Sequence, residues 1–120
     1  MKFLIASEGG GLGDSVSLHF TRAPFFILFD PGKGSCEDIT NNGESRPEIV
    51  IHESAKHGVK GLICGHVEPD VFLTAQDNSL TIFLSPPITV RKAVEMASKN
   101  QLRIAQAPTI FPGRSRQGGS

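Results

Sequence analysis

The sequence predicts a three-layer α/β/α domain with a mixed five-stranded sheet and helices on both faces. Three short strand patterns are separated by helical patterns, which indicates parallel strands joined by right-handed crossovers. An early pair of strand patterns is joined by a short turn, so those two strands must be antiparallel. With 120 residues, the chain is long enough for one such domain with a single core.

The strands are expected at five places along the chain. The segment 3–6 is a continuous apolar run, suited to a strand buried on both faces, and 25–29 is a second such run. A turn containing Pro and Gly connects this run to an edge strand at 35–40. Two further strands are expected at 59–64 and 80–84.

Three helices are expected between and after the later strands. The first helix is expected to start near Ser45, whose spacing to Glu48 is that of a capping box, and to end near Lys56. Pro47 at the first helical position would shift the cap to Arg46. Pro69 opens a second, short helix. Thr89 caps the last one, in which apolar residues recur at the helical spacing i, i+3, i+4 and i+7. These residues are Val90, Ala93, Val94 and Ala97.

The domain is expected to span residues 1–103. Beyond it, residues 104–120 contain two prolines and three glycines without any period. This composition is typical of a disordered tail, in which Ile110 and Phe111 form the one part expected to dock.

The composition argues against several classes of function. The net charge is zero, but residues 1–90 hold eleven acidic against six basic residues, whereas 91–120 hold six basic against one acidic. The aromatic residues are all Phe and lie mostly in apolar runs, so no nucleic-acid stacking surface is expected. No apolar segment approaches the roughly 20 residues that span a membrane. We recognise no secretory signal and no CxxC spacing, and we therefore expect a cytoplasmic protein with neither a nucleic-acid nor a membrane partner.

The stretch 7–26 carries the strongest candidate for a functional site. Its glycines can take positive φ, so several backbone N–H groups could converge on an anion. His19 and Arg22 follow and could offer an imidazole and a guanidinium to the same ligand. In an open α/β sheet, ligands bind beyond the carboxyl ends of the parallel strands. That edge is expected to gather 7–13, 65–68 and 85–89.

The same stretch also resembles a known family. A Gly-rich turn is followed by Ser17-Leu18-His19-Phe20-Thr21-Arg22-Ala23, by further aromatic residues and by an apolar strand ending at Asp30. This pattern resembles the opening of the dinitrogenase iron–molybdenum cofactor biosynthesis family. The resemblance continues at 58–65, 81–86 and 89–94, so it covers about residues 1–103. One departure is Glu68, which stands where family members often have glycine and puts the family's loop shape there in doubt.

The resemblance implies a ribonuclease H-like form of the α/β/α fold and a site for an anionic metal–sulfur cluster. The cluster would be iron–molybdenum cofactor or another cluster of molybdenum with iron or copper. Backbone N–H groups, guanidinium and neutral imidazole are chemically suitable partners for it. The expected binding residues are Gly9, Gly10, Gly11, Gly13, His19, Arg22, Gly65 and His66, with His19, His66 and Cys64 as candidate metal ligands. A protein that donates or accepts the cluster is an expected partner, and the chain itself is expected to be a monomer or weak dimer.

Each candidate residue also has a purely structural interpretation. His19 could cap a loop, and the glycines could form only a flexible turn. Arg22 could form an ion pair with Asp14 or Asp30. Cys64 ends an apolar strand, where a cysteine usually serves as a small buried hydrophobe.

We recognise no catalytic constellation, so the protein is expected to bind or carry the cluster without catalysing a reaction. Two-metal nuclease chemistry needs several converging carboxylates, and the first strand contains none. The alternative is an interaction or regulatory module with a vestigial pocket, whose basic last helix and tail dock an acidic partner. The two interpretations differ over His19 and Arg22. A binding pocket leaves both side chains open to solvent, whereas a vestigial pocket buries them in salt bridges.

Overall fold

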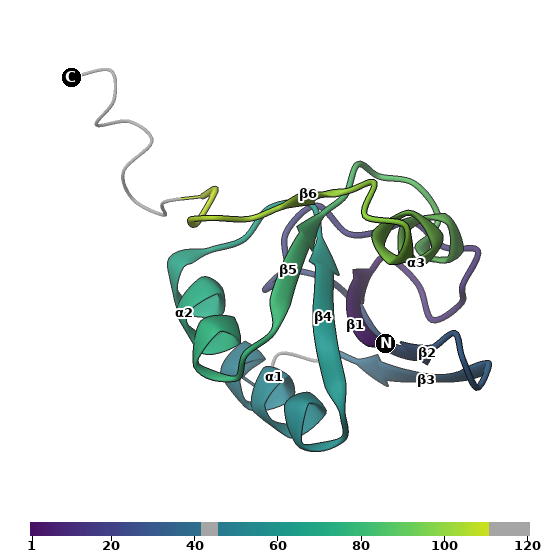
Figure 1. Ribbon diagram of the computed structural model, residues 1–120, viewed down its shortest axis with the longest axis horizontal. Helices are drawn as coiled ribbons and strands as arrows, with labels where there is room; N and C mark the ends of the chain where they lie inside the picture. Colours follow the sequence, from purple (N-terminus) through teal and green to yellow (C-terminus); the bar gives the residue numbers. More distant parts are fainter. Residues whose placement is uncertain (42–45, 111–120) are drawn as a thin grey trace.

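The computed structural model describes residues 1–41 and 46–110. Within these residues, three helices cover the two faces of a six-stranded sheet with the strand order β3-β2-β1-β4-β5-β6 (Figure 1). The strands are β1 (Lys2–Ser7), β2 (Phe25–Asp30), β3 (Ser35–Thr40), β4 (Val59–Cys64), β5 (Thr81–Leu84) and β6 (Arg103–Ile104). The helices are α1 (Pro47–Lys56), α2 (Pro69–Asp77) and α3 (Val90–Ser98).

The sheet is mixed, as the sequence predicts. Strands β1, β4 and β5 are parallel neighbours, whereas β2 and β3 form an antiparallel extension on one side. All five predicted strands are present. The predicted number is nevertheless wrong, because the sheet also contains a sixth strand, β6. Strand β6 pairs antiparallel with β5, with Phe83 opposite Ile104 and Leu84 opposite Arg103. A strand of two residues shows no alternation of polar and apolar side chains, so the sequence pattern could not reveal it.

The central strands are buried on both faces, which gives the domain two apolar layers. In β1, Leu4 and Ala6 join the layer beneath α1 and α2, while Phe3 and Ile5 join the layer beneath α3. These side chains have no exposed surface. Because successive side chains of a strand point to opposite faces, a continuous apolar run fits this position. The predicted three-layer arrangement is confirmed (Figure 1).

The predicted shift of the first helix cap to Arg46 and the predicted cap at Thr89 are confirmed. Ser45 lies outside the described residues. Arg46 is the N-cap residue of α1, with Pro47 at the first position of the helix. Thr89 caps α3, because its Oγ1 accepts a hydrogen bond of 3.1 Å from the backbone N–H of Lys92. That bond satisfies one of the N–H groups that a helix start leaves without a partner.

Residues 104–110 do not match the predicted disordered tail. The backbone N–H of Ala105 donates to Ile82 O at 2.9 Å, and the N–H groups of Thr109 and Ile110 donate to Val67 O at 2.9 and 3.2 Å. This segment therefore belongs to the domain, and the boundary predicted at residue 103 falls too early. The remainder of the predicted tail, Phe111 included, lies outside the described residues.

None of the described helices is both long and apolar enough to span a membrane. The expectation of a ribonuclease H-like form of the fold stays a prediction.

Candidate functional site

The carboxyl ends of the parallel strands meet at one edge of the sheet, and the segment 15–20 crosses them. Ser17 N–H donates to Ala6 O at 2.8 Å, at the end of β1. Its own carbonyl accepts from Gly65 N–H at 3.0 Å, beyond the end of β4. His66 N–H then donates to Leu18 O at 2.6 Å. These bonds fasten the crossing segment to β1 and β4 and place its side chains at the expected ligand-binding edge.

Gly65 makes this crossing possible. A Cβ atom at this position would lie 2.7 Å from the carbonyl oxygen of Leu18 and 2.9 Å from its Cα. Those atoms belong to the backbone and cannot move aside as the end of a side chain would. The first role of Gly65 is therefore to let two backbone segments approach closely.

His19 and His66 are brought side by side at this edge. The two residues form an isolated parallel bridge, and their ring centroids are 6.0 Å apart with an interplanar angle of 32°. His19 is half-buried and His66 is exposed. The Nδ1 of His66 lies 3.3 Å from Thr109 Oγ1. Imidazole nitrogens bind metals at about 2.0–2.1 Å, so rings at this separation are near enough to contact one ligand together.

A cavity of about 470 Å³ opens beside His66. Its walls come from the ends of β4 and β5 and from the segment after α3. The lining residues are Gly65, His66, Leu84, Ser85, Pro86, Arg103 and Thr109. Arg103 is exposed and forms no ion pair with any described residue, and no carboxylate is among the residues that line the cavity. The charge of this cavity suits an anionic ligand.

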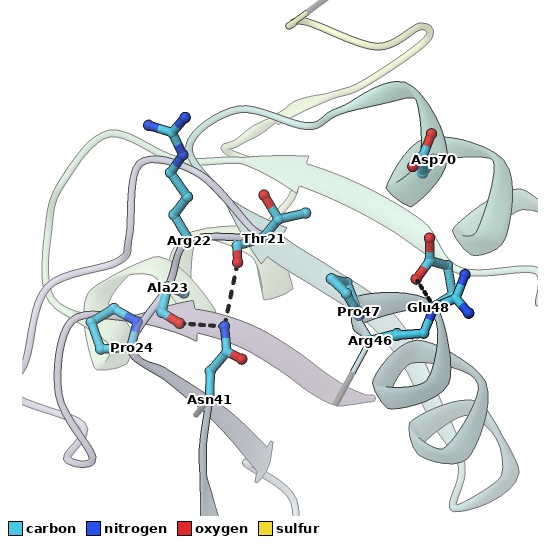
Figure 2. A pocket seen from close by; sticks show the side chains of 9 residues that line it. All are labelled: Thr21, Arg22, Ala23, Pro24, Asn41, Arg46, Pro47, Glu48 and Asp70. Atoms are coloured by element: carbon cyan, nitrogen blue, oxygen red, sulfur yellow. Dashed lines mark hydrogen bonds and ion pairs between the residues drawn. The ribbon is translucent and has the colours of Figure 1, made fainter. Parts of the chain in front are cut away.

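Arg22 lies at a different cavity, of about 510 Å³, between the loop after Phe20 and the starts of α1 and α2. Figure 2 shows its guanidinium pointing away from the ion pair of Arg46 and Glu48, which are 4.0 Å apart. Arg22 is exposed and pairs with no described carboxylate. The structure therefore brings His19 and His66 together but places the predicted guanidinium elsewhere.

The ion pairs expected of a vestigial pocket do not form among the described residues. The possible ion pairs of Arg22 with Asp14 and Asp30 are absent from the structure. Asp14 Oδ2 instead accepts from Gly11 N–H at 2.9 Å, and Asp30 Oδ1 accepts from Gly32 N–H at 3.0 Å. Neither His19 nor Arg22 forms a salt bridge to a described residue, but Arg22 alone is exposed to solvent, since His19 is half-buried.

Comparison with protein families matches residues 1–100 to the family described as dinitrogenase iron-molybdenum cofactor. The chain belongs to this family. The match ends before β6, so Arg103 and Thr109 lie outside it.

Solved structures agree with the family. The apo form of the orange protein from Desulfovibrio gigas is 26% identical, with a TM-score of 0.80 over 91% of this chain and 96% of that chain. A putative NifB protein from Thermotoga is also 26% identical, with a TM-score of 0.77 over 91% and 97%. A putative dinitrogenase from Methanocaldococcus jannaschii shares the fold, with 18% identity and a TM-score of 0.70 over 90% and 97%. A search among curated proteins found no match to this chain.

The Gly-rich loop of this family member does not form the predicted anion nest. The glycines at 9, 10, 11 and 13 have no positive φ; the described glycines that do are Gly34 and Gly58. The carboxylate of Asp14 fills the loop, since a Cβ on Gly9 would lie 2.4 Å from its Oδ2. Gly9 N–H donates to Ser7 Oγ at 3.2 Å and Gly11 N–H to Asp14, so both donors are already used. The anion that this loop binds is therefore the carboxylate of Asp14.

Cys64 is placed in the core, as its structural interpretation proposed. It is fully buried, and burial raises the pKa of its thiol well above the usual value, with the negative charge of Glu68 adding to the effect. Metals bind the thiolate, which this environment disfavours. Among the described residues, no three His, Cys, Asp or Glu side chains gather to hold a metal. A metal group at this edge would therefore depend on few protein ligands.

Glu68 does not disrupt the turn after β4, despite its departure from the family pattern. It is the N-cap residue of α2, and its carbonyl accepts from Phe72 N–H at 2.9 Å. Its side chain is 9% exposed and accepts a hydrogen bond of 2.5 Å from Thr21 Oγ1, whereas Oε1 has no described partner. Glu68 thus ties the loop that carries Arg22 to the turn that carries His66.

Sequence reasoning missed two residues of this site. Arg103 is the last residue of the predicted domain and Thr109 falls in the predicted disordered tail, and neither was expected at the site, although both line the cavity beside His66. The only sequence signal near them was the apolar Ile110, which was expected to dock.

Proposed function

We propose that the protein binds an anionic metal–sulfur cluster at the carboxyl edge of its sheet and carries it without catalysing a reaction. The cluster would be iron–molybdenum cofactor-like, or another sulfide cluster of molybdenum with iron or copper. The observation that carries the proposal is the open cavity that His66 and Arg103 line without any carboxylate, together with the pairing of the His66 ring with His19. Membership of the cofactor family gives the ligand its chemical class.

The small number of cysteines supports a cluster whose sulfur is inorganic sulfide rather than cysteine thiolate. A four-cysteine iron–sulfur site needs four thiolates, and this chain has two cysteines. One of them, Cys64, is buried with its thiol held neutral, and Cys36 lies on the exposed edge strand β3. Imidazole and guanidinium groups can hold an anionic cluster through one or two bonds and through charge.

The residues have different roles in this proposal. His19 and His66 offer ring nitrogens to the cluster. Gly65 permits the approach of the segment that carries His19. Arg22 lies at the neighbouring cavity and supplies positive charge at the same edge of the molecule. The N–H groups of Gly9 and Gly11 are bonded within the chain, so this proposal gives the Gly9–Gly13 loop no direct contact with the cluster.

The test is an anaerobic titration of the metal-free protein with tetrathiomolybdate and iron or copper, followed by visible absorption and metal analysis. We expect saturable, stoichiometric charge-transfer bands that persist after desalting. His19→Ala and His66→Ala should weaken them, and Arg22→Ala should do so to a smaller extent. The matched control is His57→Ala, because His57 is exposed at the end of α1. If no metal is retained after desalting, the carrier function is wrong and the interaction module becomes the better interpretation.

A further inference from the structure

Residues 103–110 form a strap across the carboxyl edge of the sheet. The strap starts as β6 beside β5, and Ala105 remains bonded to Ile82 O at 2.9 Å. It then passes to Val67, whose carbonyl accepts from the N–H groups of Thr109 and Ile110. Figure 1 shows this segment in yellow, running from β6 toward the start of α2. The strap thus supplies a wall of the cavity that the two strand ends alone would leave open.

Arg103 places a permanent charge in that wall. Arg103 lies in β6, and its backbone pairs with that of Leu84 in β5. The residue is therefore held by the sheet rather than by a loop. Its side chain is exposed and pairs with no carboxylate among the described residues. A guanidinium stays charged at any physiological pH and donates several hydrogen bonds in one plane, which suits oxygen or sulfur anions.

Thr109 acts on His66 rather than on the ligand. Its Oγ1 accepts a hydrogen bond of 2.8 Å from the backbone N–H of Val67, which fixes the hydroxyl in place. The hydroxyl oxygen keeps a second lone pair, and it lies 3.3 Å from Nδ1 of His66. A partner at one ring nitrogen of a histidine determines which tautomer is present and which nitrogen remains for a ligand.

We infer that the strap makes the cavity specific for an anionic thiometalate through Arg103 and Thr109. Arg103 contacts the anion directly. Thr109 is a positioning residue: its Oγ1 accepts a hydrogen bond from Nδ1–H of His66 and so leaves Nε2 as the nitrogen that faces the ligand. The inference rests on the proposed function for the class of ligand. It assigns roles to two residues beyond the part of the chain that the family comparison matches.

The charge of Arg103 is tested by titrating the Arg103→Gln variant with tetrathiomolybdate at several salt concentrations. We expect the affinity to fall about tenfold, the size of one lost charge-assisted hydrogen bond, with a weaker dependence on salt. The matched control is Lys60→Gln, which removes one charge from the amino-terminal part of β4, far from the carboxyl edge. An equal loss in both variants would overturn the role of Arg103, because net charge alone would then explain the binding.

The role of Thr109 is tested in the metal-free protein. We expect Thr109→Val to change the ring-nitrogen chemical shifts of His66 toward a different tautomer mixture, and Thr109→Ser to preserve the wild-type shifts. The backbone bond from Thr109 N–H to Val67 O remains available in both variants, and amide spectra of β4 and β5 report whether the fold is intact. Unchanged shifts in folded Thr109→Val would overturn the positioning role.

The two experiments separate this inference from the proposed function. If wild-type protein binds tetrathiomolybdate but neither strap variant differs from its control, the carrier function stands and the inference fails. If wild-type protein binds none, the proposed function fails together with the role of Arg103. The tautomer of His66 still decides the role of Thr109 in that case.

Discussion

Two turns at the carboxyl edge of the sheet contain glycine and a carboxylate, yet they are filled in opposite ways. In the loop after β1, Asp14 folds back onto the backbone and accepts a hydrogen bond from Gly11 N–H. In the turn after β4, Gly65 holds two backbones together while His66 faces an open cavity. In the first turn, the N–H groups of Gly9 and Gly11 are bonded within the chain. In the second turn, the side chain of His66 remains available to a ligand.

The difference teaches where an anion site can form in such a fold. Backbone N–H groups of a Gly-rich loop attract anions in general, but a carboxylate three residues along the chain is always present at high effective concentration. At the second turn, Glu68 is buried and bonded to Thr21, so its carboxyl group is absent from the cavity lining. The cavity therefore keeps its positive charge because the nearby carboxylate of Glu68 is bonded elsewhere.

The largest effect is expected from Gly65→Ala. Its Cβ would lie 2.7 Å from Leu18 O, so the segment 15–20 must shift. We expect a loss of about 3 kcal/mol in the free energy of unfolding, typical of severe overpacking, together with weaker thiometalate binding. Gly13→Ala is the matched control, because a Cβ there meets no atom within 4 Å. Urea denaturation of both variants measures the difference, and equal stabilities would show that the two turns do not differ in this respect.

A smaller loss is expected from Thr21→Val. This variant removes the hydroxyl that donates to Glu68 Oε2 and leaves both oxygens of a buried carboxyl group without a partner. Such a loss costs about 2 kcal/mol. Thr21→Ser keeps the hydroxyl and should recover most of the stability. Thermal unfolding of the three proteins tests this, and a Ser variant as unstable as the Val variant would assign the effect to packing of the methyl group.

The sequence predicts the scaffold better than the site, for reasons that these residues make clear. Runs such as Phe3–Ala6 must be buried on both faces, so their pattern alone places them in the centre of a sheet. Sheet topology places His66 at the carboxyl edge and the family motif draws attention to His19, but the pairing of their rings appears only in the structure. The hydrogen bond from Gly11 N–H to Asp14 depends on the rotamer of the Asp14 side chain, which residue patterns in a sequence do not predict. The strap at 103–110 is held mainly by backbone hydrogen bonds, and these leave no trace in residue types.

Removal of the carboxylate from the first turn is expected to have a modest effect. Asp14→Ala deprives Gly11 N–H of its partner at an exposed position, which should cost about 1 kcal/mol. Asp38→Ala is the control, since Asp38 lies beside Gly10 but makes no side-chain hydrogen bond with a described residue. Urea denaturation compares their stabilities. Thiometalate affinity should stay unchanged in Asp14→Ala if the Gly-rich loop is separate from the binding cavity, and a clear gain in affinity would show that the freed loop has become an anion site.

The smallest effect on binding is expected from modification of the exposed cysteine. Burial and the charge of Asp38 raise the pKa of Cys36, so its thiolate appears at higher pH than that of a free cysteine. Its alkylation rate at pH 7 should therefore be low and should rise with pH, because only the thiolate reacts. Cys64 is fully buried with its own pKa raised further, and it should react only after unfolding. Mass spectrometry after timed alkylation identifies which thiol has reacted. Protein alkylated at Cys36 should bind tetrathiomolybdate as the unmodified protein does, and lost binding would move the site from the carboxyl edge toward β3.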